Sequence, residues 1–295
     1  MDTIDALMHG APGVTAVFLV EGRATALVEA GPRTSIDAVM EGLATRGVDR
    51  LDWIVVTHIH LDHAGGAGAL ARRFPEAKVA VHRVGAPHLV DPSKLWSSAA
   101  RIYGDKMESL WGSMDPIPQE RVHILDDGDT IDLGGRTLTA VETPGHARHH
   151  HSLLDDVTGT MFTGDALGVR LPDIAVTRPA TPPPEFNLEE ALASIQKIRE
   201  RRPQRLALTH FGVQDVPVDE MCDSAAEALR RWAEYVEQAR ARTKDLDSAT
   251  ELVRASVEED LPTLPPDGVD RLERTTSYWM NTWGYMRYFD KKEQA

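Results

Sequence analysis

The chain has 295 residues and carries 32 lysines and arginines against 46 aspartates and glutamates, so its formal net charge is −14 with histidine counted neutral. A surface this acidic repels a phosphate backbone, and we expect no nucleic-acid partner. With 42% hydrophobic and 26% charged residues, the composition is that of a globular protein with a sizeable core, which excludes disorder as a global description.

Apolar segments and cysteine usage predict the compartment. The apolar stretch Val14–Val20 is far shorter than a membrane span of roughly 20 residues, and the leader Met1–Asp5 has no basic region, so we expect neither membrane association nor a secretion signal. The single cysteine, Cys222, excludes an internal disulfide and fits a cytoplasmic protein. Any metal would therefore be held by histidines and carboxylates rather than by a thiolate cluster.

Short apolar runs rich in Val, Leu and Thr predict strands through the first two thirds of the chain. In chain order they are 14–20, 24–29, 53–57, 78–81, 137–142, 160–164 and 206–209. Helical patterns lie between several of them. The alternation predicts an α/β fold, and hairpin-like pairs of runs indicate mixed rather than purely parallel sheets.

Capping signals predict where two of these helices begin and end. Ser35 is a candidate N-cap for a helix over 36–46, and Gly47 follows in the position that ends helices. Asn187 with Glu190 three residues later is typical of a capping box and begins a helix that runs to about residue 201.

The strand signals stop near residue 217, and apolar stripes at helical spacing follow. One stripe predicts a long helix over 221–239, and after a proline-rich break at 261–268 a second predicts an amphipathic helix over 269–286. We therefore divide the chain into a catalytic domain, 1–217, and a helical extension, 218–295. Aromatic residues of the extension are expected to pack on the core, with a pocket wall or a homodimer interface as the alternatives: Tyr278, Trp279, Trp283, Tyr285, Tyr288 and Phe289.

A histidine-rich motif directly follows the strand 53–57. It reads His58-Ile-His60-Leu-Asp62-His63 and continues into Ala-Gly-Gly. Residues two apart on an extended segment face the same side, so His58 and His60 can hold one metal ion. A turn into a helix redirects Asp62 and His63 toward a second point. Burying so many polar side chains without a partner would be costly, which favours metal binding over core packing.

Three further segments place a histidine or aspartate at a strand end. His146 lies in Thr-Pro-Gly-His after the strand 137–142, Asp165 lies in Thr-Gly-Asp within and after 160–164, and His210 lies in Thr-His-Phe-Gly after 206–209. Strand ends are where open α/β sheets build their sites. Each segment alone is a weak signal, but their order after the first motif indicates remote ligands of the same site.

With these motifs the sequence resembles the metallo-β-lactamase superfamily over roughly residues 14–215. The resemblance implies an αββα sandwich, two mixed sheets face to face with helices outside. It also implies that Asp165 bridges two ions, with the remaining ligands divided as His58, His60 and His146 for the first metal and Asp62, His63 and His210 for the second. Cys222 lies outside every motif, which argues against the cysteine-using antibiotic hydrolases. The pattern is closer to hydroxyacylglutathione hydrolases (glyoxalase II), lactonases and related esterases, in an uncharacterised branch.

Other residues are candidates for substrate contact or for orienting ligands. One of His149, His150 and His151 would orient a ligand or solvent, and His150 is a substrate-binding candidate together with His88 and Tyr103. The segment 84–120, which contains tryptophans and Tyr103, and the proline-rich segment 172–184 are expected to shape the pocket.

These inferences predict a dinuclear hydrolase acting on a small-molecule ester, lactone or thioester. Two ions, zinc by default with iron or manganese accepting the same ligands, would produce a bridging hydroxide that attacks a carbonyl, and Asp62 would orient it as the catalytic residue. The alternative is a phosphodiesterase with the same two-metal site, against which the net charge counts.

Overall fold

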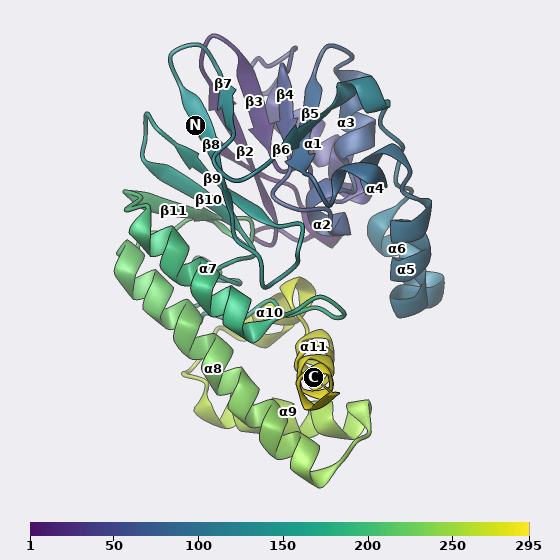
Figure 1. Cartoon of the computed structure of the whole chain (residues 1–295), viewed down its shortest axis with the longest axis vertical. Helices are drawn as coiled ribbons and strands as arrows, with labels where there is room; N and C mark the ends of the chain where they lie inside the picture. Colours follow the sequence, from purple (N-terminus) through teal and green to yellow (C-terminus); the bar gives the residue numbers. More distant parts are fainter. Residues whose placement is uncertain (295) are drawn as a thin grey trace.

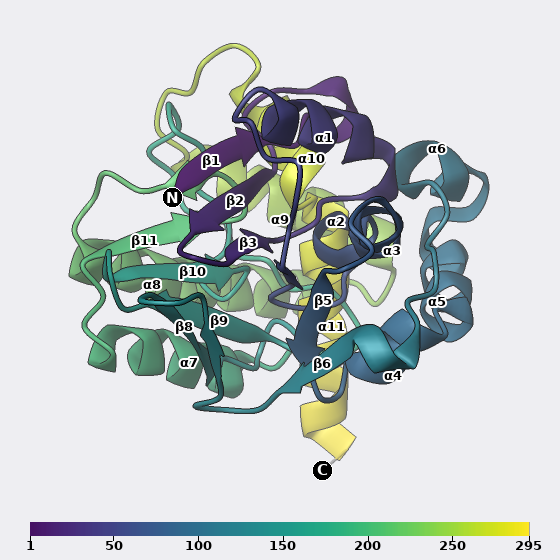
Figure 2. The ribbon, with the colours of Figure 1, turned by 90° about the horizontal axis from the view of Figure 1, so that it is seen from above.

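The computed structural model describes residues 1–294 as two stacked β-sheets with helices on both outer faces (Figures 1 and 2). The first sheet has the order β1-β2-β3-β4-β5-β6 and the second the order β12-β11-β10-β9-β8-β7. Strands of the first sheet are β1 (Asp2–Asp5), β2 (Ala16–Glu21), β3 (Thr25–Val28), β4 (Trp53–Val55), β5 (Lys78–His82) and β6 (Val122–Leu125). Strands of the second are β7 (Thr130–Asp132), β8 (Thr137–Glu142), β9 (His151–Asp155), β10 (Thr160–Gly164), β11 (Arg205–Leu208) and β12 (Gly212–Val213).

Both sheets are mixed, as the sequence predicts. In the first sheet β1, β2 and β3 pair antiparallel while β3 to β6 run parallel, and in the second sheet β10 and β11 form the parallel pair. The inner faces of the two sheets form one apolar layer, in which Phe18 of β2 meets Phe162 of β10 with ring centroids 5.1 Å apart. The αββα prediction is confirmed.

Helices cover the outer faces of the sheets, lie along the edge of the sandwich and form the C-terminal extension. They are α1 (Ile36–Ala44), α2 (Leu61–Ala64), α3 (Ala67–Arg73), α4 (Ala86–Val90), α5 (Ser93–Tyr103), α6 (Met107–Trp111), α7 (Leu188–Glu200), α8 (Val218–Arg242), α9 (Leu246–Asp260), α10 (Gly268–Thr275) and α11 (Tyr278–Gln294). Short 3₁₀ helices lie at Met8–Gly10, Arg33–Ser35, Gly104–Lys106 and Gln119–Arg121. One apolar cluster packs α1 and α3 on the first sheet, and another joins the second sheet to α7, α8, α9 and α11. Among residues 1–294 we find no helix with the length and apolarity needed to cross a bilayer.

The capping predictions have different outcomes. The Asn187 side chain accepts a hydrogen bond from the Glu190 amide, which confirms the start of α7. Gly47 adopts a φ of 72°, the left-handed conformation expected after a helix. Ser35 is a correction, because it makes no capping bond with its side chain and lies in a 3₁₀ turn that leads into α1, and α1 ends at Ala44 rather than at residue 46.

The helical extension also departs from its prediction. The expected single helix over 269–286 is two helices, because Thr276 is extended and the Ser277 hydroxyl accepts a hydrogen bond from the Met280 amide, which caps α11. The helix α9 was missing from the prediction, although Asp245 caps it by accepting from the Ser248 amide. The strands end at Val213 and α8 begins at Val218, while the division into two domains stays a prediction.

A buried ion pair ties the two sheets together and gives a stability prediction. Arg136 donates to both carboxylate oxygens of Asp155, at 2.9 and 2.6 Å, and to the Glu21 carbonyl of β2 at 2.9 Å. The Asp155 side chain is fully buried and that of Arg136 is 8% exposed. Replacing Asp155 with asparagine would leave a buried guanidinium without its counter-charge, and we expect the free energy of unfolding to fall by about 3–5 kcal/mol.

Urea unfolding of the purified Asp155→Asn variant measures this loss. The matched control is Asp126→Asn, which breaks the exposed pair between Arg83 and Asp126 and should cost less than about 1 kcal/mol. Equal losses in the two variants would contradict the structural role assigned to the buried pair.

Candidate metal centre

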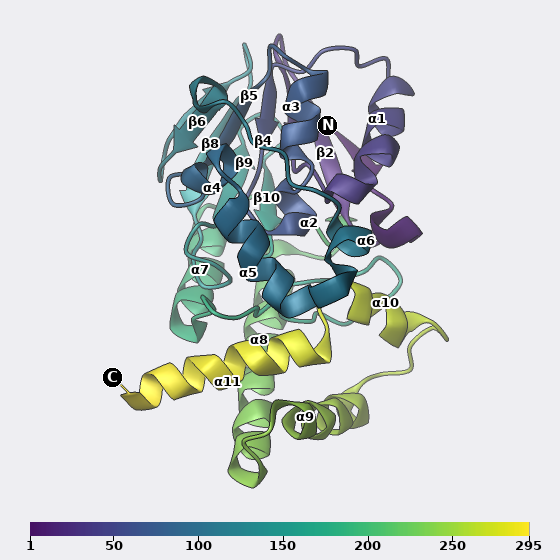
Figure 3. The same cartoon turned by 90° about the vertical axis from the view of Figure 1, so that its right-hand side faces the viewer.

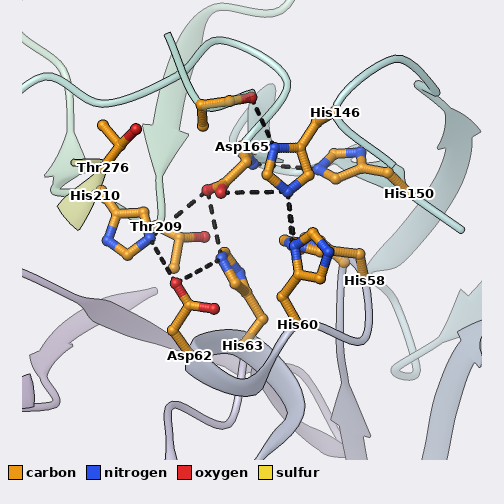
Figure 4. A network of polar contacts seen from close by, with 12 residues as sticks. His58, His60, Asp62, His63, His146, His150, Asp165, Thr209, His210 and Thr276 are labelled. Carbon is orange, nitrogen blue, oxygen red and sulfur yellow. Dashed lines mark hydrogen bonds and ion pairs between the residues drawn. The ribbon is translucent and has the colours of Figure 1, made fainter. Parts of the chain in front are cut away.

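The predicted ligands meet at one edge of the sandwich, where strands of both sheets end (Figure 4). His58 and His60 lie between β4 and α2, and Asp62 and His63 lie on α2. The second sheet supplies the others from the chain after its strand ends: His146 after β8, Asp165 after β10 and His210 after β11. The edge is fixed by a hydrogen bond across the sheets, from the His151 amide of β9 to the Thr57 carbonyl at 3.0 Å.

A first cluster consists of three imidazoles with converging nitrogens. His60 Nδ1 lies 3.0 Å from His58 Nε2 and 2.8 Å from His146 Nε2, and the latter two nitrogens are 3.2 Å apart. A tetrahedral zinc ion with bonds of about 2.0–2.1 Å to nitrogen places its ligand atoms about 3.3 Å apart. The spacing of the three nitrogens therefore fits one divalent ion.

Hydrogen bonds on the far side of the rings fix which nitrogens face inward. The Thr57 hydroxyl donates to Glu29 Oε1, so it accepts from His58 Nδ1 at 3.1 Å, and His146 Nδ1 donates to the Ala180 carbonyl at 2.9 Å. Both Nε2 atoms are then free of protons. Burial, reinforced by the neighbouring imidazoles, holds the pKa of His58 and His60 well below the usual value. Unprotonated nitrogens facing one another are stabilised by a shared cation.

A second cluster combines two imidazoles with two carboxylates. His210 Nε2 lies 3.4 Å from Asp62 Oδ2 and 3.7 Å from Asp165 Oδ1, and His63 Nε2 lies 3.7 and 3.4 Å from the same two oxygens. These nitrogens and Asp165 Oδ1 are buried and make no hydrogen bond within residues 1–294. Buried polar atoms without partners are rare in folded proteins, and a divalent ion would satisfy all of them.

Charge in this second cluster also favours a cation. Burial opposes a positive charge on His63, but the carboxylates of Asp165, Glu29 and Asp62 outweigh it and raise its pKa well above the ordinary value. His63 Nδ1 faces Glu29 Oε1 at 2.9 Å, and His210 Nδ1 donates to the Val14 carbonyl at 2.8 Å, so both rings direct Nε2 toward the carboxylates. The donor set fits a divalent metal ion.

Asp165 lies between the clusters. Its Oδ2 is 3.6 Å from His146 Nε2, while its Oδ1 is 3.4 Å from His63 Nε2. Each carboxylate oxygen thus faces a different group of ligands, which is the arrangement that a bridging carboxylate requires. The structure brings all of the sequence-predicted metal ligands together in overlapping groups of metal-binding atoms.

The sequence prediction missed Glu29, which supports both clusters. This carboxylate is fully buried and accepts hydrogen bonds from the hydroxyls of Thr57, the residue before His58, and Thr209, the residue before His210, in addition to the contact with His63. The available signal was an acidic residue at the end of an otherwise apolar strand. An isolated carboxylate would be costly there, so its position indicates partners.

The substrate-contact candidates have different positions. Tyr103 and His88 line the cavity described below, whereas His150 does not. His150 is fully buried, its Nδ1 lies 2.8 Å from the Thr143 hydroxyl, and its Nε2 accepts from the Asp165 amide at 3.2 Å. The expectation that His150 contacts substrate is thus corrected, since His150 is buried outside the cavity lining and holds the backbone amide of Asp165. A Cβ at Gly164, where φ is 50°, would lie 2.5 Å from His150 Nε2. The close packing of the backbone against the His150 ring therefore requires glycine at this position.

The site opens into a cavity of about 1480 Å³. Its walls include residues of α5 and α6 from the segment 84–120, the chain from Ala180 to Glu185, and residues from Glu273 to Asn281 on α10 and α11. Residues 172–179 of the proline-rich segment do not line it. Among the aromatic residues of the extension, Trp279 lines the cavity, while Tyr278, Tyr285 and Tyr288 are buried in the core.

The helical extension is connected to the candidate ligand His146 by hydrogen bonds through residues 179–181. The fully buried Asn281 of α11 donates to the Pro179 carbonyl at 2.8 Å and accepts from the Thr181 amide at 3.0 Å. Between those residues lies Ala180, whose carbonyl accepts from His146 Nδ1. Gly284 permits the close approach, since a Cβ there would lie 1.6 Å from the Thr181 carbonyl oxygen.

Comparisons with known proteins agree with this architecture. A family model described as the metallo-beta-lactamase superfamily matches residues 9–210. The metallo-beta-lactamase fold-containing protein ST1585 of Sulfurisphaera tokodaii is 30% identical over 206 residues, which are 68% of this chain and 74% of that protein. The solved structure of ST1585 matches with a TM-score of 0.70 at 25% identity and covers 96% of this chain and 97% of that one.

Two shorter matches carry names of enzymes. A hydroxyacylglutathione hydrolase of Aeromonas hydrophila is 33% identical over 131 residues, 44% of this chain and 39% of that protein. An atrochrysone carboxyl ACP thioesterase of Aspergillus fumigatus is 28% identical over 156 residues, 52% of this chain and 40% of that protein.

The fold and the two ligand clusters define an αββα protein with a site suited to divalent cations. The chain belongs to the metallo-β-lactamase superfamily, as the family model and the match to ST1585 establish. Membership of this superfamily supports a hydrolase, and the fold implies divalent metal ions at the histidine-rich edge.

Proposed function

We propose that the protein is a dinuclear metal-dependent hydrolase that cleaves an ester, lactone or thioester. The observation that carries the proposal is the sharing of Asp165 between two clusters of metal-binding atoms at the end of a large cavity. The names of the two enzyme relatives support an acyl substrate. Zinc is the first choice for ligands of this kind, with iron and manganese as alternatives.

Each side chain has a role in this proposal. His58, His60 and His146 would hold one ion, and Asp62, His63 and His210 the other. Two bound ions would lower the pKa of water and polarise a carbonyl group. Asp62 both lines the cavity and faces His210, so it is placed to orient the attacking water toward a substrate carbonyl.

Buried contacts behind the ligands hold this geometry during turnover. Glu29 fixes the ring of His63, and the Ala180 carbonyl fixes that of His146. Preorganised ligands reduce the reorganisation that accompanies the chemical step. The ligand side chains that line the cavity are thereby held in place.

Parallel assays of metal-reconstituted protein test the proposal. We expect turnover of a γ- or δ-lactone series or of S-lactoylglutathione, loss of that turnover after chelation, and recovery after metal is added back. The variant His123→Gln, which removes a histidine on β6 outside the ligand clusters, should retain full activity. Turnover confined to bis(p-nitrophenyl) phosphate would replace the proposal with the phosphodiesterase alternative. Metal analysis well below two ions per chain would refute the dinuclear site.

A further inference from the structure

The cavity wall carries basic side chains without ion-pair partners. Lys94, Arg101, Lys106 and Arg274 line the cavity, and within residues 1–294 none of them lies within ion-pair distance of a carboxylate. In contrast, the remaining lining arginine, Arg148, pairs with Glu185 at 2.7 Å. These unpaired cations are unexpected in a chain with a net charge of −14.

The lining also holds acidic residues, but most of them have other partners. Asp62 and Asp165 belong to the ligand clusters, and Glu273 pairs with the buried Arg178 at 2.7 Å. Asp105 is the remaining lining carboxylate that is neither in a ligand cluster nor in an ion pair. Four lining cations and one lining carboxylate therefore remain outside the ligand clusters and the ion pairs, and low-dielectric cavity walls focus this unpaired positive charge on an incoming ligand.

Two of these four cations lie on one face of α5. Lys94, Ser97, Ser98 and Arg101 all line the cavity and recur at helical spacing. The face therefore offers an ammonium, a guanidinium and hydroxyl donors together, and these are the groups that bind carboxylates and phosphates. Figure 3 shows α5 and α6 above the start of α11, with α10 beside it, and Arg274 of α10 lines the same cavity.

The rest of the lining is apolar and the volume is large. Leu95, Ile102, Trp111 and Met280 line the same cavity. Pockets for drug-sized ligands have volumes of about 300–1,000 Å³, so a cavity of about 1480 Å³ exceeds what a small ester fills. A ligand that fits this cavity is larger than a small ester and has an apolar part and an anionic group.

We propose that the α5 face binds a carboxylate or phosphate that the substrate carries away from its scissile carbonyl. The inference rests on the proposed hydrolase function for the reacting end of the substrate, while the anion site itself does not depend on turnover. The substrate class is thereby narrowed to anionic, partly apolar esters or thioesters.

A binding experiment tests the anion site without catalysis. The probes are the anionic dye 1-anilinonaphthalene-8-sulfonate and its neutral relative N-phenyl-1-naphthylamine, titrated by fluorescence into the metal-loaded protein. In the variant Lys94→Gln/Arg101→Gln we expect the dissociation constant of the anionic dye to rise about tenfold and that of the neutral dye to change less than about twofold. The control Arg230→Gln/Lys244→Gln makes the same charge change outside the cavity lining and should leave both dissociation constants unchanged. Equal binding of the anionic dye to both double variants would overturn the proposal.

Matched substrates identify the anion. Butyryl and succinyl thioesters of N-acetylcysteamine differ by a carboxylate on the acyl side, and butyryl-coenzyme A adds phosphates on the thiol side. We expect the wild-type KM to be lowest for one anionic substrate, and Lys94→Gln/Arg101→Gln to raise that KM about tenfold with kcat nearly unchanged. Hydrolysis without any preference for an anionic substrate would refute the inference and leave the hydrolase proposal intact. A charge-dependent dye affinity without acyl hydrolysis would refute the hydrolase proposal and leave the anion site intact.

Discussion

Replacing Asp165 with alanine should lower kcat/KM by at least about 10³-fold and reduce the bound metal. Its two carboxylate oxygens face different ligand clusters, so the substitution removes a ligand from each. It also leaves the free nitrogens of His63 and His210 with one carboxylate instead of two. A metal ion contributes several kcal/mol of transition-state stabilisation, and about 4 kcal/mol corresponds to a thousandfold in rate.

Metal content per chain and kcat/KM on the same preparation check this expectation. The control Asp37→Asn removes an exposed carboxylate of α1 and should change neither quantity. Circular dichroism of the Asp165→Ala variant checks that it is folded. An Asp165→Ala protein that retained two ions and full activity would refute the bridging assignment, even if the other ligands were correct.

The sequence could predict which side chains meet at this edge because each one follows a recognisable strand. Strand ends meet at one edge of a sandwich. Residues as distant in the sequence as His58 and His210 could therefore be assigned to one site before the structure showed how close they lie in space. The short strands were harder to predict. β1 and β7 each contain a single apolar residue, Ile4 and Ile131, and β12 is formed by Gly212 and Val213. Their stability therefore comes from pairing with neighbouring strands rather than from a local pattern.

The groups behind the ligands could not be predicted from local patterns. Glu29 becomes informative only when its neighbours in space, Thr57 and Thr209, are known. Asn281 lies 100 residues after Thr181, which it anchors. An asparagine at this position is equally compatible with an exposed helix surface, so the residue type alone does not indicate the contact. The break between α10 and α11 could not be predicted from the apolar spacing, because that spacing continues through Thr276. The signal for the break was Ser277, which caps α11.

Replacing Asn281 with alanine should weaken metal binding although the residue is not a ligand. The substitution removes the anchors of Pro179 and Thr181, and the Ala180 carbonyl between them orients His146. Loss of contacts that orient a metal ligand typically lowers metal affinity about 10–100-fold. The buried Thr181 amide would also lose its acceptor, so we expect a decrease of about 1–3 kcal/mol in the free energy of unfolding.

The control for Asn281→Ala is Tyr285→Phe on the same helix. The Tyr285 hydroxyl donates to the Leu229 carbonyl of α8 at 2.7 Å, so its removal should destabilise the extension without reaching residues 179–181. Competition with a chelator gives the metal affinity of each variant, and the visible spectrum of the cobalt-substituted protein reports the ligand geometry. We expect a changed cobalt spectrum and weaker metal binding only in Asn281→Ala, because only that variant releases the carbonyl that holds His146. If both variants lose stability and neither changes metal affinity or the spectrum, the extension stabilises the fold without positioning the ligand.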